Sequence, residues 1–133
     1  MLAFVVAAAL LSSACSATSP PDGGSGASAK PKIEVRNAFA RMQARLYEGC
    51  GQSKEYCASY LDSSVENLDF LLRAMNEDPK GADHFAAPVK WIKEMQEKVP
   101  DHSGGAIVKH EAEIVQTMKR VNEWMQGHPE DYR

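Results

Sequence analysis

The chain has 133 residues with 15 basic and 18 acidic side chains, which gives a formal net charge of -3. This length accommodates one core of roughly 100 residues and argues against a second domain. The slightly acidic balance excludes the basic face by which proteins bind nucleic acid. Apolar residues fill 12 of the first 14 positions but only about 39% of the remainder, which is typical of one soluble domain behind an apolar leader.

The apolar pattern of residues 1–14 predicts a signal peptide that is removed on export. An unbroken apolar run covers positions 1–11. Spanning a bilayer as a helix takes about 20 apolar residues, so this run is too short for a permanent anchor and is typical of a secretory signal. The ending Leu11-Ser12-Ser13-Ala14-Cys15 resembles the lipobox of bacterial lipoproteins. The resemblance implies cleavage before Cys15 and attachment of a diacylglycerol to its sulfur.

Residues 15–30 predict a lipid-attachment cysteine followed by a flexible tether. The stretch from Ser16 to Ala29 reads SATSPPDGGSGASA, which contains almost no large side chain. Such a composition cannot bury enough surface to offset the entropy of ordering it. We therefore expect the folded domain, residues 31–133, to be held outside the cytoplasm on a bacterial membrane. Ordinary cleavage at the same site, which would release a secreted protein, and an uncleaved anchor are the alternatives.

Residues 31–133 predict an all-α fold, because apolar residues recur at spacings of three and four and no segment alternates as a half-buried strand does. The first predicted helix begins at Pro31 and ends near Gly49, and the second ends at an interruption over residues 76–81. A capping box formed by Ser63 and Glu66 leaves open whether the second helix is continuous.

Two more helices complete the prediction. The third segment carries apolar residues from Phe85 to Val99, and the last runs from Ile107 to a stop at Gly127 and Pro129. Four amphipathic helices joined by short connections predict an antiparallel bundle. A bundle of three helices with a fourth loosely attached is the alternative.

Cys50 and Cys57 predict a structural disulfide. If Cys15 carries lipid, these two are the remaining cysteines, and an even pair in an exported chain is typically oxidised. The Cys-x₆-Cys spacing is not that of a zinc knuckle, and a redox-active pair is more often Cys-x-x-Cys. The polar segment GQSKEY between the cysteines indicates a corner between two helices.

Three of the four tyrosines, Tyr47, Tyr56 and Tyr60, surround this predicted corner. Tyrosine is enriched at binding hot spots because it offers a rigid apolar ring with a polar tip. The corner is therefore the candidate contact surface for a protein or another component of the cell envelope. The alternative is that the three rings only cover helix ends and pack on the disulfide.

The sequence carries no strong motif for catalysis or for binding a cofactor. It contains no nucleophile elbow, phosphate-binding glycine loop, zinc-protease motif or covalent haem motif. The alternative is a helical bundle that binds a non-covalent haem or a metal. Its candidate ligands are Met42 on the first helix and His110 on the last, because both lie on apolar stripes of neighbouring helices. We expect a protein that acts by binding and not by catalysis, with no cofactor or metal.

Overall fold

The computed structural model describes residues 33–102 and 104–133. The predicted signal peptide, the lipid-attachment residue Cys15 and the tether lie outside these residues. The described elements are α1 (Val35–Leu46), α2 (Lys54–Glu77), α3 (Gly81–His84), α4 (Ala86–Lys98), the 3₁₀ helix η1 (Gly104–His110), α5 (Glu111–Gln126) and the 3₁₀ helix η2 (Pro129–Asp131).

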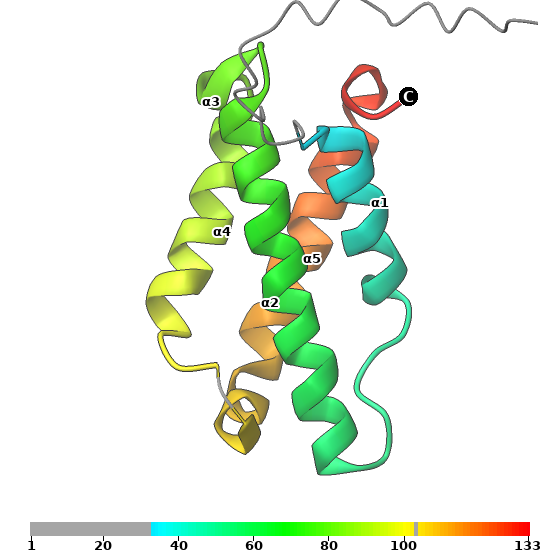
Figure 1. The fold of residues 1–133 in the computed structure, drawn as a ribbon, viewed down its shortest axis with the longest axis vertical. Helices are drawn as coiled ribbons and strands as arrows, with labels where there is room; N and C mark the ends of the chain where they lie inside the picture. Colours follow the sequence, from blue (N-terminus) through cyan, green and yellow to red (C-terminus); the bar gives the residue numbers. More distant parts are fainter. Residues whose placement is uncertain (1–32, 103) are drawn as a thin grey trace, which may run out of the picture.

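The four long helices α1, α2, α4 and α5 form an antiparallel bundle in which successive helices run in opposite directions (Figure 1). α1 packs against α2 and α5, and α4 packs against the same two helices from the other side. The predicted all-α bundle is confirmed. All four helices belong to one packed core, so the alternative with a loosely attached fourth helix is wrong.

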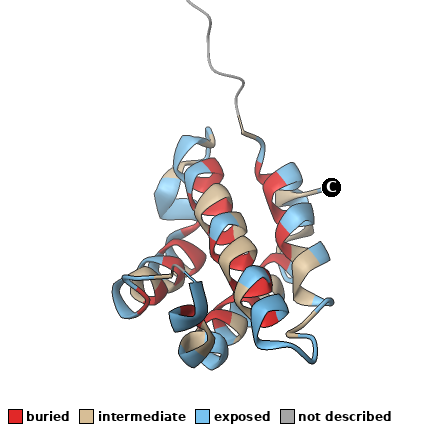
Figure 2. Cartoon of the chain, turned by 60° about the horizontal axis from the view of Figure 1, so that its bottom comes forward, coloured by how far each residue is buried: buried red, intermediate tan, exposed pale blue. Residues whose placement is uncertain are grey.

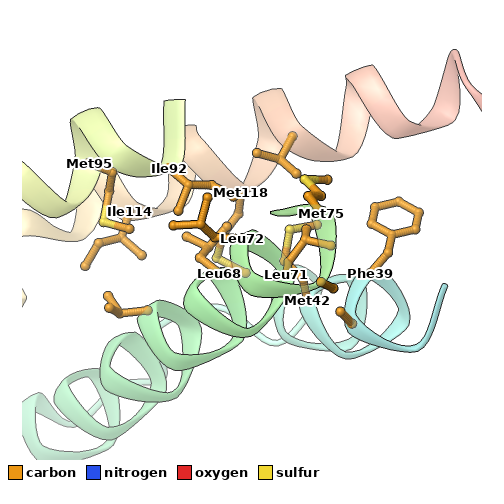
Figure 3. Packing of buried hydrophobic residues seen from close by; sticks show 14 of the residues in the cluster. Phe39, Met42, Leu68, Leu71, Leu72, Met75, Ile92, Met95, Ile114 and Met118 are labelled. Atoms are coloured by element: carbon orange, nitrogen blue, oxygen red, sulfur yellow. The ribbon is translucent and has the colours of Figure 1, made fainter. Parts of the chain in front are cut away.

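Each helix buries one stripe of its surface against the others (Figure 2). The stripes of all four helices interdigitate in the centre, where leucine, isoleucine and methionine side chains meet (Figure 3). The fully buried large side chains are Phe39, Phe85, Met42, Leu61, Leu68, Leu71, Met75, Ile92, Met95, Ile107, Ile114 and Met118. Burial of this apolar surface drives the association of helices that would be marginal alone.

α2 is continuous over 24 residues, so the helix break that a capping box at Ser63 would cause does not occur. The side chains of this region bond to the backbone of the preceding turn instead. The Ser64 hydroxyl donates to the Tyr60 carbonyl oxygen at 2.7 Å, and the Asn67 amide donates to the Ser63 carbonyl oxygen at 2.8 Å. These polar side chains are thus accommodated within a continuous helix, which is held by apolar packing on both sides of Ser63, and the predicted cap at Ser63 does not form.

The last predicted helix has two parts with different geometry. Gly104 has φ +59°, in the left-handed region that favours glycine, and opens the 3₁₀ helix η1. α5 follows at Glu111. η1 packs on the first half of α2, which extends beyond the twelve-residue α1. None of the helices in the described parts of the chain combines the length and apolar character needed to cross a membrane.

Candidate contact surface at the disulfide corner

The predicted disulfide is present and joins the connection after α1 to the first turn of α2. Cys50 and Cys57 are bonded through their sulfurs, with their Cα atoms 4.4 Å apart. Ser53 caps α2 by accepting a hydrogen bond from the Tyr56 backbone N–H at 3.0 Å. The cap and the disulfide together fix the direction in which α2 leaves the connection. Residues 47–57 are called the disulfide corner below.

Two glycines give the corner its shape. Gly49 has φ +70°, in the left-handed region that glycine adopts without strain. Gly51 lies against the ring of Tyr56 so closely that a Cβ atom built on it would be 2.6 Å from Tyr56 Cδ1. Any side chain at position 51 would therefore displace the Tyr56 ring, so this glycine sets where the ring lies.

The three predicted tyrosines do not share one environment. Tyr47 is 78% exposed and Tyr56 is 49% exposed, and they are the exposed large hydrophobic side chains in the described residues. Tyr60 is 3% exposed and belongs to the core. The structure therefore brings two of the predicted contact residues to the surface and assigns the third to packing.

The hydroxyl of Tyr60 is buried and has no hydrogen-bond partner in the part of the chain that the structure describes. Burial raises the pKa of Tyr60, and the nearby Ser64 hydroxyl and Gly49 backbone oppose this increase only in part. Glu48 and Glu111 also raise the pKa, because their negative charges disfavour a tyrosinate. Tyr60 is thus a neutral phenol beneath the corner.

A surface hollow of about 570 Å³ lies beside the corner, between the first half of α2 and the start of η1. Its lining residues are Lys54, Glu55, Ala58, Ser59, Asp62, Gly104 and Gly105. His102 Nδ1 lies 3.2 Å from Asp62 Oδ1 and ties the connection after α4 to α2. This hollow has no signal in the sequence, because it forms between segments about 45 residues apart in the chain.

Met42 and His110 are not brought together. Met42 is fully buried in the core, and its neighbour Gln43 donates a hydrogen bond to Asn122 Oδ1 at 2.9 Å. His110 ends η1, twelve residues before Asn122, and this separation corresponds to about 18 Å along a helix axis. α1 packs on the second half of α5, so His110 is too far along the bundle to share a haem with Met42.

α3 and the C-terminal segment lie at the end of the bundle where α1 begins (Figure 1), and a polar cluster joins them there. His84 Nε2 lies 2.9 Å from both carboxylate oxygens of Asp131, and Lys80 also forms an ion pair with this carboxylate. Nearby, the rings of Trp124 and His128 stack with centroids 3.7 Å apart. No local pattern in the sequence predicts this cluster, because its members lie in or next to α3, the end of α5 and η2, which are far apart in the chain.

The pKa of Asp131 is lowered by these contacts. Desolvation of the carboxyl group raises the pKa, but the hydrogen bonds and positive charges of Lys80 and His84 outweigh it. Asp131 is therefore an ionised carboxylate that links the C-terminal segment to α3. These contacts give the cluster a structural role, because they hold the C-terminal segment against α3.

Comparison of the chain with protein-family models, with curated proteins and with solved structures finds no match. The architecture and the disulfide corner describe the structural class of this protein. It is an antiparallel four-helix bundle whose first helix–helix connection is closed by a disulfide. Within this class, the candidate functional surface is the pair Tyr47 and Tyr56 with the adjoining hollow.

Proposed function

We propose that this protein is a lipid-anchored binding module of a bacterial cell envelope, which contacts a protein partner through Tyr47 and Tyr56. One observation carries the proposal: the two exposed large hydrophobic side chains of the described residues, Tyr47 and Tyr56, both belong to the disulfide corner. Aromatic rings exposed in this way are enriched at the centres of protein interfaces, where a partner removes them from water.

The rigidity of the corner supports a binding role. Immobilising a flexible side chain on binding costs about 0.5–1.5 kcal/mol, and this cost falls when the side chain is already held in place. Tyr56 packs on Gly51, and its backbone is fixed by the Ser53 cap and by the neighbouring disulfide. A partner would therefore meet an ordered ring and not a mobile one.

The position of the corner in the bundle supports display from a membrane. The first described residues precede α1 at one end of the bundle, whereas the start of α2 lies at the other end (Figure 1). A lipid on Cys15 and a tether over residues 16–30 would approach the bundle at the end of α1 that is remote from the corner. The corner would then project away from the membrane, where a partner can reach it.

The proposal is tested by photo-cross-linking in a bacterial host that expresses the full chain with its own first 14 residues. A photoreactive residue at position 47 should form a protein adduct, and the adduct should disappear when Tyr56 is changed to Ala. The same photoreactive residue at position 126, an exposed site at the end of α5 that is remote from the disulfide corner, serves as the matched control. Equal adduct yields from positions 47 and 126, or an adduct indifferent to Tyr56→Ala, would contradict the contact surface.

The anchoring is measured on the same preparations. The intact mass of membrane-extracted protein should begin at residue 15 and include a diacylglycerol, and Cys15→Ser should release the protein from the membrane fraction. An unmodified chain that begins at Met1 would refute the anchor without bearing on the contact surface. A soluble chain cut at the same site would favour the secreted alternative.

A further inference from the structure

Glu111 lies next to the disulfide, although it is 54 residues away from Cys57 in the sequence. One carboxylate oxygen of Glu111 and the sulfurs of Cys50 and Cys57 all lie within 4.8 Å of one another. Glu111 is the first residue of α5, and α5 is positioned by its packing against α4 and α1. The fold thus adds a third potential ligand that the Cys-x₆-Cys spacing alone does not supply.

We propose that reduction of the Cys50–Cys57 disulfide creates a binding site for a thiophilic divalent cation of the Zn²⁺ class, with both thiolates and the Glu111 carboxylate as ligands. A dithiol supplies the two electrons: it becomes a cyclic disulfide, and Cys50 and Cys57 become thiols. The cation then displaces one proton from each thiol. Three protein ligands with water in the fourth position form a common zinc site.

The distances are compatible with this site. Zn–S bonds of about 2.3 Å and Zn–O bonds of about 2.0–2.2 Å in a tetrahedron separate the ligand atoms by roughly 3.5–3.8 Å. The three atoms are already confined to a region of that size, so small side-chain movements suffice once the sulfur–sulfur bond is broken. Cys57 and Glu111 also lie on helices of the bundle, so the core holds two of the ligands without the disulfide.

The surroundings also suit a bound cation. Cys57 is 5% exposed, so a cation there would be partly withdrawn from water, where its attraction to thiolates is strong. Tyr60, three residues after Cys57 on α2, is also buried, with 3% of its surface exposed.

The site is controlled by the redox state of the cysteines. The disulfide offers no thiolate, and a carboxylate alone is a weak ligand, so the oxidised protein should not bind the cation. This inference is independent of the proposed contact with a protein partner. Loss of cation binding would leave the tyrosine surface intact, and loss of the partner would leave the cation site intact.

The experiment uses the full chain carrying Cys15→Ser, so that Cys50 and Cys57 are its remaining cysteines. The chain is reduced with dithiothreitol and freed of it under anaerobic conditions, and Co²⁺ is the spectroscopic probe. We expect a thiolate-to-cobalt charge-transfer band that saturates at one Co²⁺ per chain and disappears when Zn²⁺ is added. Glu111→Gln should weaken the binding of Co²⁺ at least tenfold. Glu123→Gln, at the exposed far end of the same helix, is the matched control and should bind as the unaltered chain does.

The absence of the charge-transfer band in the reduced chain would overturn the proposal, as would equal Co²⁺ affinity of the Glu111→Gln variant and the unaltered chain. Far-ultraviolet circular dichroism of the same samples detects unfolding on reduction. A reduced chain that loses helix and regains it with Zn²⁺ supports the site, because cation binding then drives folding. A reduced chain that neither binds nor refolds with Zn²⁺ overturns it.

Discussion

At the scale of single residues, three tyrosines within fourteen positions have different environments. Tyr47 follows α1 and extends into solvent, Tyr56 lies on Gly51 at the surface, and Tyr60 enters the core. Tyr60 is four residues after Tyr56 on α2, but Tyr60 is 3% exposed whereas Tyr56 is 49% exposed. Residue type indicated that the rings could serve a contact, and burial decided which of them are available to one.

Tyr60→Phe should stabilise the protein by about 1 kcal/mol, because it removes a buried hydroxyl that has no hydrogen-bond partner in the described structure. Burial raises the pKa of Tyr60, so the unfolded chain ionises first as the pH rises. The contribution of neutral Tyr60 is complete below about pH 10 and is lost as the pH passes the folded-state pKa. Tyr60→Phe should therefore also reduce the loss of stability in alkali.

Urea unfolding from pH 7 to 11 measures both effects. Tyr132→Phe is the matched control, because its hydroxyl is exposed and donates to Gln126 Oε1 at 3.2 Å, so stability should change by less than about 0.5 kcal/mol. A clear loss of stability in Tyr60→Phe would mean that this hydroxyl does have a partner.

At the scale of elements, the unequal lengths of α1 and α2 determine the shape of the end of the bundle that carries the disulfide corner. α2 has 24 residues and α1 has 12, so α1 covers only the second half of α2. The first half is packed instead by η1 and by the disulfide-closed connection. This half of α2 contributes both the exposed Tyr56 and most of the lining of the hollow.

The double substitution Cys50→Ser with Cys57→Ser should destabilise the protein by about 2.5 kcal/mol. Closing a loop of eight residues lowers the entropy of the unfolded chain by roughly this amount in the chain-entropy model. Thermal unfolding should show a Tm decrease of about 10–20 °C with helical content retained below the transition. The measurement is circular dichroism against the oxidised chain, with Ser59→Ala as a surface control. An unchanged Tm would show that the disulfide does not stabilise the domain.

At the scale of the whole molecule, the C-terminal segment lies at the same end of the bundle as the beginning of α1. η2 follows α5 and lies beside the beginning of α1, where the rings of Phe39 and Tyr132 have centroids 4.9 Å apart. The contacts of Asp131 with His84 and Lys80 join this segment to α3. The end of the bundle near the predicted tether is therefore closed by contacts between the first, third and last parts of the fold.

Asp131→Asn should destabilise the protein by about 1–2 kcal/mol at pH 7, because it removes the charged partner of His84 and Lys80. The folded-state pKa of Asp131 lies below its ordinary value. The corresponding stability is therefore complete above about pH 4 and is lost as the pH falls through the folded-state pKa. The difference between the variant and the unaltered chain should narrow as the pH decreases.

Urea midpoints at pH 7, 4, 3 and 2 test this expectation. Asp83→Asn, on the exposed surface of α3, should change the midpoint little and provides the control. A difference that is constant over the whole pH range would show that the Asp131 contacts do not depend on its charge.

The sequence alone predicted the helical class and the disulfide, and it left open whether the bundle has four helices or three with a fourth loosely attached. Spacings of three and four between apolar residues are a local property. Two cysteines seven positions apart on one helix would be about 10.5 Å apart, too far for a disulfide, so their bond requires a connection between helices at this point. The break suggested by Ser63 and Glu66 was wrong, because packing along α2 outweighed a local cap.

Only the tertiary structure decided which residues meet across the bundle. The separation of Met42 from His110, the burial of Tyr60 and the approach of Glu111 to the sulfurs all depend on how far each helix extends along its neighbours. Periodicity defines the buried face of a helix but does not define its axial register against another helix. That register follows from packing the whole core, to which every helix contributes.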